Sequence, residues 1–341
     1  MTMMLAVRYR GPRQAFVLQA VAIPEPGRGQ IRLRIEACGM CHTELHLRDG
    51  LLDLGPRDFT IGHEIAGTID AVGAEVDSAR VGERVVVYYY EGCMHCAYCA
   101  AGDEHLCPQV AAQPGFTSDG GYAEYMVVRA RNCVVVPDHV SLVDIAPMGC
   151  AGSTAVHAGK LADIKPGDWV VVHGAGGVGL AVLQYARHLG AKVIAIGLGA
   201  ERLALATSLG AVATIDAAQV IDPAAEVMRL TGEGADVVFE LVGRESTMRA
   251  SVAMLRRRGR LVLIGYSADE FRVHPIGIIV REARIIGSVG STLEDLREIV
   301  ALVAEGVVRP LIDHTLPLGA FEDGFAAMEA QTILGRIVLV P

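Results

Sequence analysis

From about Ala151 onward, short apolar segments alternate with helical segments, and this alternation limits the possible folds more than any other feature of the chain. The apolar segments are rich in β-branched residues and mostly uncharged, as in strands that are buried on both faces of a parallel sheet. We therefore predict a doubly wound parallel sheet of the α/β class, covered by helices on both faces. The expected strands are 170–173, 192–196, 214–216, 236–240, 260–264 and 285–288, and the expected helices between them are 177–189, 201–209, 224–230 and 246–255.

Residues 1–150 have a different texture. Short β-like segments at 31–35, 65–72 and 84–90 are separated by Gly and Pro, and helical patterns are scarce. After Thr292 two helical patterns follow, at 293–305 and 320–331, and the chain ends in a strand-like segment at 336–340. A length of 341 residues agrees with two domains, and the change of texture predicts a border near residue 150.

The first strand of the alternating region runs into a glycine-rich turn that opens a helix. Gly174, Gly176 and Gly179 form the pattern G-x-G-x-x-G inside a strand–helix–strand unit of suitable length. There Gly174 permits the tight turn, Gly176 lets the backbone approach a pyrophosphate, and Gly179 lets helix and strand pack closely. The N–H groups at the helix start favour phosphate binding. The pattern predicts a dinucleotide site, and the alternative is a packing turn that binds no ligand.

The acidic residue that usually binds the ribose of NAD is missing. It is expected at the end of the next strand, where Gly197 stands instead. Glu201 and Arg202 follow four and five residues later. The sequence therefore leaves the choice between NAD and NADP open.

Four cysteines within fifteen residues form the sharpest local motif. Cys93, Cys96, Cys99 and Cys107 can close a tetrahedral zinc site with no open position, which predicts a structural metal. An iron–sulfur cluster is the first alternative, but the spacing does not match common ferredoxin motifs. Two disulfides are the second, but we see no secretory signal that would indicate an oxidising compartment. Of the histidines in this segment, we expect His95 and His105 to face the solvent.

A second set of metal-ligating residues is spread along the chain. Cys38 and Cys41, then His63, and much later Cys150 can together form a three-ligand zinc site that keeps a fourth position for water or substrate. Spacing alone does not choose Cys41 over Cys38. Each residue taken singly is also compatible with a buried core thiol or a hydrogen-bonded histidine.

Taken in order, Cys41-His42-Thr43, Gly62-His63-Glu64, the four cysteines, Cys150, the glycine turn and Gly335-Arg336 resemble the zinc-dependent alcohol dehydrogenases of the medium-chain dehydrogenase/reductase superfamily. The resemblance covers essentially the whole chain. It implies a Rossmann dinucleotide-binding domain at 151–289 and a β-rich, GroES-like catalytic domain at 1–150 and 290–341 that carries both zinc sites. The cleft between the two would hold the nicotinamide and the catalytic zinc.

The resemblance also implies individual roles. Cys41, His63 and Cys150 correspond to the ligands of a catalytic zinc, Glu64 to an acid near that zinc, and Glu44 to the acid that orients the ligand histidine. Thr43 and His46 correspond to the ends of a proton relay that runs through the cofactor ribose. Tyr89 corresponds to an aromatic wall of the substrate pocket, whereas Cys38 and Cys133 are expected to be core thiols. The implied cofactor contacts are His42, Gly174, Gly176, Gly177, Val178, Gly179, Gly197, Arg202 and Arg336.

The implied function is reversible hydride transfer between a primary or secondary alcohol and NAD(P), with two zinc ions per chain and a preference for NAD over NADP. The alternatives are a polyol or amino-alcohol dehydrogenase, a nicotinamide-binding protein without catalysis, and a zinc-ribbon protein that binds nucleic acid. A non-catalytic protein would be expected to lack zinc ligands, yet Cys41, His63 and Cys150 are all present.

Charge and hydropathy argue against two classes of partner. A net charge of −9 with no basic stripe is unfavourable for nucleic acid and for anionic membrane surfaces. Residues 169–186 carry no Asp, Glu, Lys or Arg, but the glycines and His173 favour a strand, a turn and a buried helix over a membrane span. We expect a soluble, cytoplasmic protein that acts on a small molecule. The resemblance implies a homo-oligomer, either a dimer or a tetramer.

Overall fold

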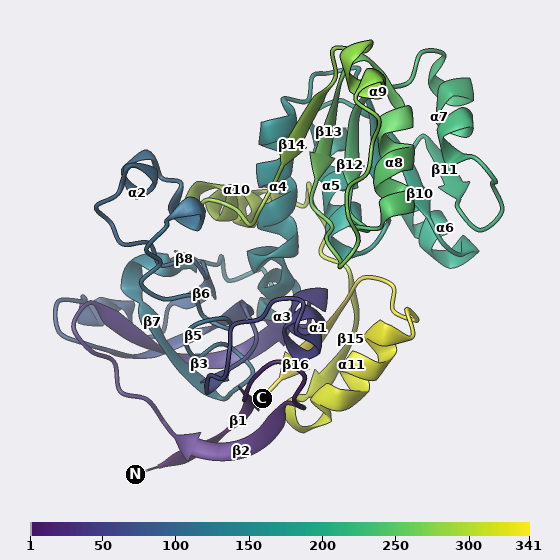
Figure 1. Cartoon of the computed structure of the whole chain (residues 1–341). Coiled ribbons are helices and arrows are strands. Elements are labelled where there is room, and N and C mark those ends of the chain that lie inside the picture. The colour runs from purple at the N-terminus through teal and green to yellow at the C-terminus, as the bar shows by residue number, and fades with distance from the viewer. Residues whose placement is uncertain (1) are drawn as a thin grey trace. The chain divides into compact units, whose positions relative to one another are not determined.

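The computed structural model describes residues 2–341, and the chain forms two units (Figure 1). Unit 1 comprises the described part of Met1–Ser153 together with Ser291–Gly306 and Pro310–Pro341. Unit 2 comprises Thr154–Gly290 and Val307–Arg309. Helix α4 (Ala151–Ala162) begins in the first unit and ends in the second.

Unit 2 is built on a six-stranded sheet in the order β11-β10-β9-β12-β13-β14, and all its strands are parallel. The sheet confirms the predicted doubly wound α/β fold. The chain builds outward from β9 through β10 to β11, and then in the opposite direction from β12 to β14. Strands β9 and β12 therefore flank the point at which the strand order reverses. The strands are β9 (Trp169–His173), β10 (Lys192–Gly197), β11 (Ala213–Asp216), β12 (Ala235–Glu240), β13 (Leu255–Leu263) and β14 (Arg284–Gly287).

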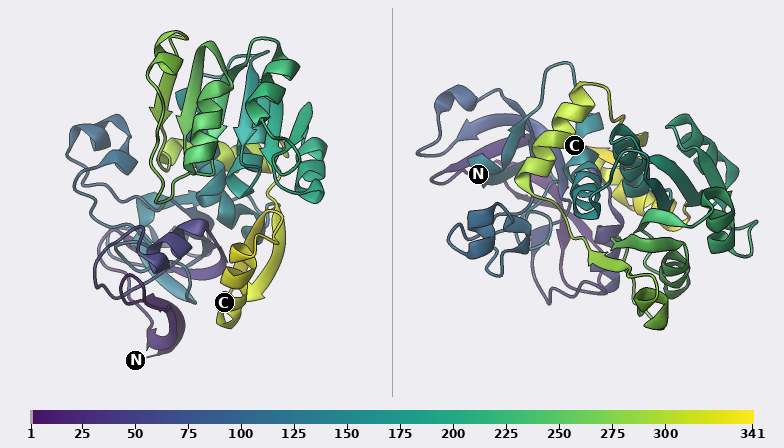
Figure 2. Two further views of the ribbon diagram at one scale, coloured as in Figure 1. Left: turned by 45° about the vertical axis from the view of Figure 1, so that its right-hand side comes forward. Right: turned by 90° about the horizontal axis from the view of Figure 1, so that it is seen from above.

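Helices lie on both sides of this sheet, as right-handed crossovers in two directions require (Figure 2). They are α5 (Gly177–His188), α6 (Ala200–Ser208), α7 (Pro223–Thr231), α8 (Glu245–Ala253) and the short α9 (Ile276–Ile279). The expected helix 246–255 ends two residues early. Leu255 is buried and pairs with Ala235, so it already belongs to β13.

Unit 1 holds a seven-stranded sheet in the order β15-β16-β3-β5-β6-β8, in which β7 also pairs with β3, and a three-stranded sheet β2-β1-β4. Its core is formed by large apolar side chains such as Tyr9, Leu33 and Met126, all almost fully buried. The strands are β1 (Met3–Tyr9), β2 (Val17–Ala22), β3 (Gln30–Gly39), β4 (Phe59–Thr60), β5 (Glu64–Val72), β6 (Arg84–Val87), β7 (Tyr125–Arg129), β8 (Cys133–Val135), β15 (Ile312–Pro317) and β16 (Arg336–Val340).

The helices of unit 1, apart from α4, range from four to twelve residues. They are α1 (His42–Asp49), α2 (Ala97–Ala101), α3 (Leu142–Ile145), α10 (Leu293–Ala304) and α11 (Phe321–Glu329), with 3-10 turns η1 (Ser78–Arg80), η2 (Glu104–Leu106), η3 (Ala130–Asn132), η4 (Ala146–Gly149) and η5 (Leu318–Ala320). Across residues 2–341 there is no helix with the length and apolar character that a membrane span needs.

The expected strand 84–90 leaves the ladder after Val87. The next residues are held by Asn132, whose side chain is fully buried and donates hydrogen bonds to the carbonyl oxygens of Tyr88 (2.9 Å) and Tyr90 (2.7 Å). The backbone N–H of Tyr88 in turn donates to the Asn132 carbonyl at 2.7 Å. A side-chain amide therefore replaces the ladder here and fixes the backbone on either side of Tyr89.

Candidate active site and structural metal site

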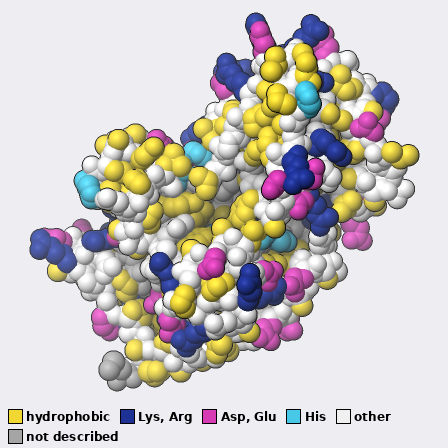
Figure 3. Space-filling view, viewed as in Figure 1, with side chains coloured by type: hydrophobic (Ala, Val, Ile, Leu, Met, Phe, Trp, Pro, Cys, Tyr) yellow, Lys and Arg dark blue, Asp and Glu magenta, His cyan; other side chains and the backbone are white. Residues whose placement is uncertain are grey.

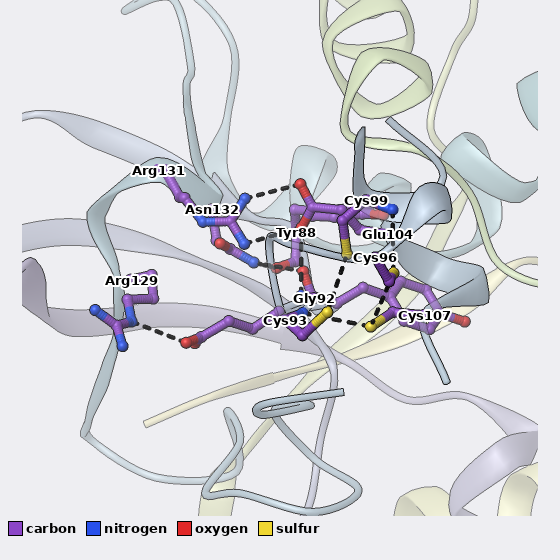
Figure 4. Close-up of polar contacts among 12 residues, drawn as sticks. Tyr88, Gly92, Cys93, Cys96, Cys99, Glu104, Cys107, Arg129, Arg131 and Asn132 are labelled. Carbon is purple, nitrogen blue, oxygen red and sulfur yellow. Dashed lines mark hydrogen bonds and ion pairs between the residues drawn. The ribbon is translucent and has the colours of Figure 1, made fainter. Parts of the chain in front are cut away.

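Four thiols converge in the segment between β6 and β7 (Figure 4). Cys96 caps the start of α2, with Cys93 before the helix, Cys99 within it and Cys107 after it. Their sulfur atoms all lie within 4.8 Å of one another. The Cys93–Cys99 sulfur pair is 4.0 Å apart and the Cys96–Cys107 pair 3.8 Å. Because four thiolates complete the tetrahedral shell of zinc, this group fits a closed metal site.

Two buried carboxylates hold this four-cysteine lobe (residues 91–112). Glu104 accepts two hydrogen bonds from the Arg131 guanidinium, at 2.8 and 2.9 Å, and one from the Gly92 N–H at 3.3 Å. Glu91 is paired with Arg129 at 2.8 Å (Figure 4). Charge-assisted pairs of this geometry fix orientation as well as adding stability. They link the segment that carries the thiols to β7, through Arg129, and to η3, through Arg131.

The two histidines of the lobe differ. His95 is exposed, as expected. The expectation that His105 faces the solvent is wrong, because its side chain is buried on η2 and its ring meets that of Tyr90 edge-on, with centroids 6.2 Å apart. Neither histidine belongs to the group of converging ligands.

A second group brings together Cys41, His63, Glu64 and Cys150, whose ligand atoms also lie within 4.8 Å of one another. They come from three separate segments: the residue before α1, the start of β5, and the residue after η4. All four side chains are buried. Two thiols, an imidazole and a carboxylate are the donors that zinc takes in catalytic sites, so the residues fit that metal.

The structure also separates the two cysteines that spacing left equivalent. Cys38 is fully buried, and its sulfur lies where Cβ atoms added to Gly62 and Gly121 would meet it, at 3.0 and 2.8 Å. Burial raises the pKa of the Cys38 thiol well above its usual value. Cys38 is therefore a core thiol, and Cys41 is the one that joins the ligand group.

Glu44 orients two members of the group. One carboxylate oxygen lies 2.7 Å from His63 Nδ1, and the other accepts the backbone N–H of Cys41 at 2.9 Å. With Nδ1 engaged by a carboxylate, Nε2 is the nitrogen left for a metal. Burial disfavours the charged ring, but Glu44 and Cys41 raise the pKa of His63 well above its ordinary value.

Arg336, at the start of β16, enters the same group. Its guanidinium lies 3.1 Å from the Glu64 carboxylate and 3.7 Å from Cys41 Sγ. Burial raises the pKa of Glu64 to about 8, against the lowering effect of Arg336. Both oxygens of this fully buried carboxylate lack a hydrogen bond in the described structure, and so does Arg336 Nε. Buried polar atoms without partners are rare, and here they point to a ligand or metal that completes the site.

Helix α1 carries the three polar residues that the resemblance singles out. His42 is exposed, whereas Thr43 and His46 are half-buried and share one helix face because they are three residues apart. Thr43 Oγ1 is 3.4 Å from Cys41 Sγ. Burial lowers the pKa of His46. Thr43 is thus next to a candidate metal ligand, and His46 lies one turn further along.

Tyr89 contacts two members of the ligand group. Its hydroxyl is 3.8 Å from Cys150 Sγ, and its ring meets that of His63 edge-on with centroids 5.0 Å apart. Phe116 packs on both rings, at 4.9 Å from His63 and 5.9 Å from Tyr89. Sequence reasoning missed Phe116, since no motif surrounds it. Its place beside His63 arises only from the fold.

The glycine turn of unit 2 has three distinct local requirements. Gly174 has φ +119°, a conformation that favours glycine. At Gly179 an added Cβ would lie 2.0 Å from the Gly174 carbonyl oxygen, so any side chain there would separate helix and strand. At Gly176 an added Cβ would meet nothing within 4 Å, which leaves open space at the start of α5. Gly177 and Val178, the first residues of that helix, are half-buried.

Gly197 ends β10 and is buried. A Cβ added there would lie 3.1 Å from the Ala175 Cβ, 3.4 Å from Leu203 and 3.7 Å from the Arg202 side chain. Arg202 therefore lies beside the position that usually carries the ribose-binding acid, and no acidic side chain occupies that position.

Known proteins are similar to this chain over most of its length. A model of the alcohol dehydrogenase GroES-like domain matches residues 27–138, and a model of zinc-binding dehydrogenases matches residues 177–305. An alcohol dehydrogenase of Geobacillus stearothermophilus is 36% identical over 324 residues, which are 94% of this chain and 95% of that protein. The chain belongs to the zinc-dependent alcohol dehydrogenases of the medium-chain dehydrogenase/reductase superfamily.

Solved structures of relatives hold either dinucleotide. Acetophenone reductase from Geotrichum candidum, in complex with NAD, has a TM-score of 0.91 at 28% identity, covering 99% of this chain and 97% of that chain. A Sinorhizobium meliloti protein described as a zinc-binding dehydrogenase, bound to NADP, has a TM-score of 0.92 at 29% identity and full coverage of both chains. This alcohol dehydrogenase is thus a zinc-dependent enzyme that transfers hydride between an alcohol and NAD(P).

Proposed function

We propose that the two ligand groups hold two zinc ions with different roles. The difference in donor set carries this proposal. Cys93, Cys96, Cys99 and Cys107 already supply four thiolates, so they leave no position for a substrate. The other group supplies two thiols, one imidazole and the carboxylate of Glu64. Because this carboxylate is paired with Arg336, we do not count it among the metal ligands. Three ligands and an open position then suit a catalytic metal.

The bound groups would supply known chemistry: zinc acts as a Lewis acid toward the alcohol oxygen, and the nicotinamide accepts the hydride. The side chains of this protein bind and orient around that chemistry. Glu44 keeps the His63 ring in place, and Arg336 balances the charge of Glu64 and Cys41. Tyr89, buried against His63 and Cys150, forms an aromatic wall of the substrate pocket.

Thr43 and His46 would move the proton of the alcohol. The Thr43 hydroxyl, next to Cys41, would take up that proton while giving up its own toward the cofactor ribose, and His46, half-buried on the same face of α1, would receive the proton at the outer end and release it to solvent. Lowering of the His46 pKa by burial keeps the imidazole neutral, and therefore able to accept a proton, down to lower pH.

Unit 2 would bind the dinucleotide and unit 1 would carry out the chemistry, with His42 and Arg336 as further cofactor contacts. The proposed contacts in unit 2 are the turn residues Gly174, Gly176, Gly177, Val178 and Gly179, followed by Gly197 and Arg202. We infer that NAD is preferred and that NADP is accepted. Gly197 removes the carboxylate that would repel a 2′-phosphate, but the loop 197–202 contains a single basic residue, Arg202, and Glu201 offers a carboxylate for the ribose.

A homo-oligomer, either a dimer or a tetramer, is supported by two exposed apolar surfaces. One lies on the four-cysteine lobe, where Figure 3 shows hydrophobic side chains gathered around α2. The other lies on α9 and at β14, which is an edge strand of its sheet. The exposed apolar residues of the lobe are Met94, Tyr98, Leu106 and Val110, and those on or next to α9 and β14 are Ile276, Ile279, Val280 and Val289. We further propose a reducing compartment such as the cytoplasm, because the six thiols of the two ligand groups must stay reduced to bind zinc.

The deciding experiment is an absorbance assay of NADH or NADPH formation by the purified protein with a panel of primary, secondary and polyol substrates, together with metal analysis. We expect turnover with simple alcohols, about two zinc equivalents per chain, and no turnover after zinc removal from the Cys41 group. One zinc equivalent in fully active protein would contradict the two-site proposal. Turnover with polyols alone would reassign the substrate class.

A further inference from the structure

Glu240, the last residue of β12, is a fully buried acid to which the site described above gives no role. Its carboxylate accepts four contacts from the loop that follows. The Val242 N–H donates at 3.1 Å, the Gly243 N–H lies at 3.1 and 3.0 Å from the two oxygens, and the Thr247 hydroxyl donates at 2.7 Å. No ion pair to Glu240 occurs in residues 2–341. A buried carboxylate without a cation depends on hydrogen bonds that replace its hydration, so the loss of one of these contacts is costly.

The clamped loop, Leu241–Gly243, lies against the glycine turn. The Leu241 N–H donates to the carbonyl of His173 at 3.0 Å. A Cβ added to Gly174 would meet Val242 at 3.1 Å and Leu241 at 3.2 Å. The loop after β9 and the loop after β12 are therefore in van der Waals contact on one side.

The same loop is packed from its other side by the segment after β13. A Cβ added to Gly265 would lie 2.3 Å from the Leu241 carbonyl carbon, and one added to Gly243 would lie 2.5 Å from the Tyr266 nitrogen. The Ser267 hydroxyl donates to the Gly243 carbonyl at 2.6 Å. Backbone meets backbone at both places, so the loop has little freedom to move.

The clamp also directs the backbone carbonyls. The described chain has no cis peptide bonds, and in a trans peptide the C=O points away from the N–H. Because the N–H groups of Val242 and Gly243 face Glu240, the carbonyl oxygens of Leu241 and Val242 face the other way. Neither accepts a hydrogen bond from any described residue. Ribose hydroxyls and the nicotinamide and adenine amino groups are donors that match such acceptors.

The position of the loop is the place where this fold binds ligands. It follows the carboxyl end of β12, beside the carboxyl end of β9, and the strand order reverses between these two strands. Open α/β sheets bind their ligands in the crevice at this switch point. We propose that Glu240 is a positioning residue for the cofactor: it holds Leu241–Gly243 as a rigid wall of the dinucleotide site beside the glycine turn. The proposal rests on the dinucleotide function proposed for unit 2.

The test is the affinity of Glu240→Gln for NADH, measured by fluorescence or calorimetry on the zinc-loaded full chain. Glutamine keeps the size, but its amide nitrogen cannot accept the second contact of Gly243, so the loop loosens. We expect the Kd for NADH to rise about tenfold, the cofactor KM to rise with it, and the alcohol KM to stay within about twofold. A merely structural role of Glu240 would lower the Tm without raising the KM for the cofactor relative to the KM for the alcohol.

Glu233→Gln is the matched control, because this exposed acid precedes the amino end of the same strand and its substitution removes the same charge. We expect it to bind NADH like the parent. Glu240→Asp keeps the charge but shortens the reach, and we expect an intermediate Kd. Unchanged NADH affinity in a folded Glu240→Gln would overturn the proposal, as would failure of both Glu240 variants to fold. Turnover by the parent protein tests the proposed function separately.

Discussion

The two ligand groups of unit 1 are assembled in opposite ways. The four-cysteine lobe takes all its thiols from one segment of fifteen residues, with α2 and η2 setting their spacing. The second group joins residues 41, 63, 64 and 150 from three segments that only the folded unit brings together. Two of the lobe thiols are half-buried, whereas every member of the second group is buried.

This difference indicates how each site depends on the folding of the protein. A local site can form wherever its loop closes, so its metal contributes to folding. A site built from distant segments needs the sheet first, and groups such as Glu44 and Arg336 would then impose its geometry on a bound metal. We therefore expect the lobe to govern stability and the second group to govern turnover.

The largest effect is expected from Cys150→Ser. Loss of this thiolate removes a candidate ligand of the catalytic metal while the surrounding fold remains, so kcat should fall about 10³-fold or more with little change in Tm. Steady-state assays and thermal unfolding measure the two quantities. Cys133→Ser, at a buried thiol outside both groups, is the control and should stay active. An active Cys150→Ser would remove this residue from the metal site.

Cys99→Ser should give the reverse pattern. The closed site loses a ligand and with it part of the folding free energy, so the Tm should fall on the order of 10 °C, while the surviving folded molecules keep their kcat. Calorimetry with metal analysis of the same samples measures this. If the variant melted normally and lost only activity, the assignment of the two sites would be reversed.

Unit 2 contains neither ligand group, and its sensitivity to acid should be independent of metal. Burial lowers the pKa of His173 to about 4, below the 6.5 of an unperturbed histidine. Between these values the unfolded chain binds a proton that the folded chain does not. The free energy of unfolding should therefore be greatest above pH 6.5 and fall by up to about 3 kcal/mol as the pH drops to 4. Urea unfolding at several pH values measures the slope.

His173→Gln should flatten that slope, whereas a substitution at the exposed His188 on α5 should leave it unchanged. If the pH dependence of the free energy of unfolding changed with zinc content, the acid sensitivity would belong to unit 1 instead.

His46→Gln tests the part of the second site that does not bind metal. We expect alcohol oxidation to slow about 10²-fold, mainly at lower pH, with zinc content unchanged. The value is at the low end for a proton-transfer group, because water can bypass the end of a relay. The pH profile of kcat is the measurement, and an unaltered profile would remove His46 from the relay.

The smallest effect concerns the cofactor. Gly197→Asp should raise the preference for NAD over NADP about tenfold, because the carboxylate binds the ribose and repels a 2′-phosphate. Its Cβ must displace Ala175 by a few tenths of an ångström, so a modest loss of Tm should accompany the change. The ratio of kcat/KM for the two cofactors measures the preference. A parent enzyme that prefers NADP tenfold would contradict our proposal, and Arg202→Gln would then test Arg202 as the phosphate ligand.

Much of unit 2 was predictable from the sequence, since periodicity and β-branched strands are local signals. The strand at 170–173, the glycine turn and the helix at 177–189 lie within one residue of the observed β9 and α5. The strand expected at 84–90 was less accurate at its end, because Asn132, more than forty positions away, replaces the ladder beside Tyr88 and Tyr90. The exposure expected for His105 was wrong for a similar reason: the packing of η2 decided it.

By itself, the sequence determined the α/β class, the position of the glycine-rich turn and the grouping of the four thiols, because each depends on spacings of a few residues. Only the tertiary structure decided that Cys41 and not Cys38 joins His63 and Cys150, that Phe116 packs on His63, and that Glu240 clamps the loop beside Gly174. These contacts join residues far apart in the chain. Their distances are set by how strands pair and helices pack, which no local pattern encodes.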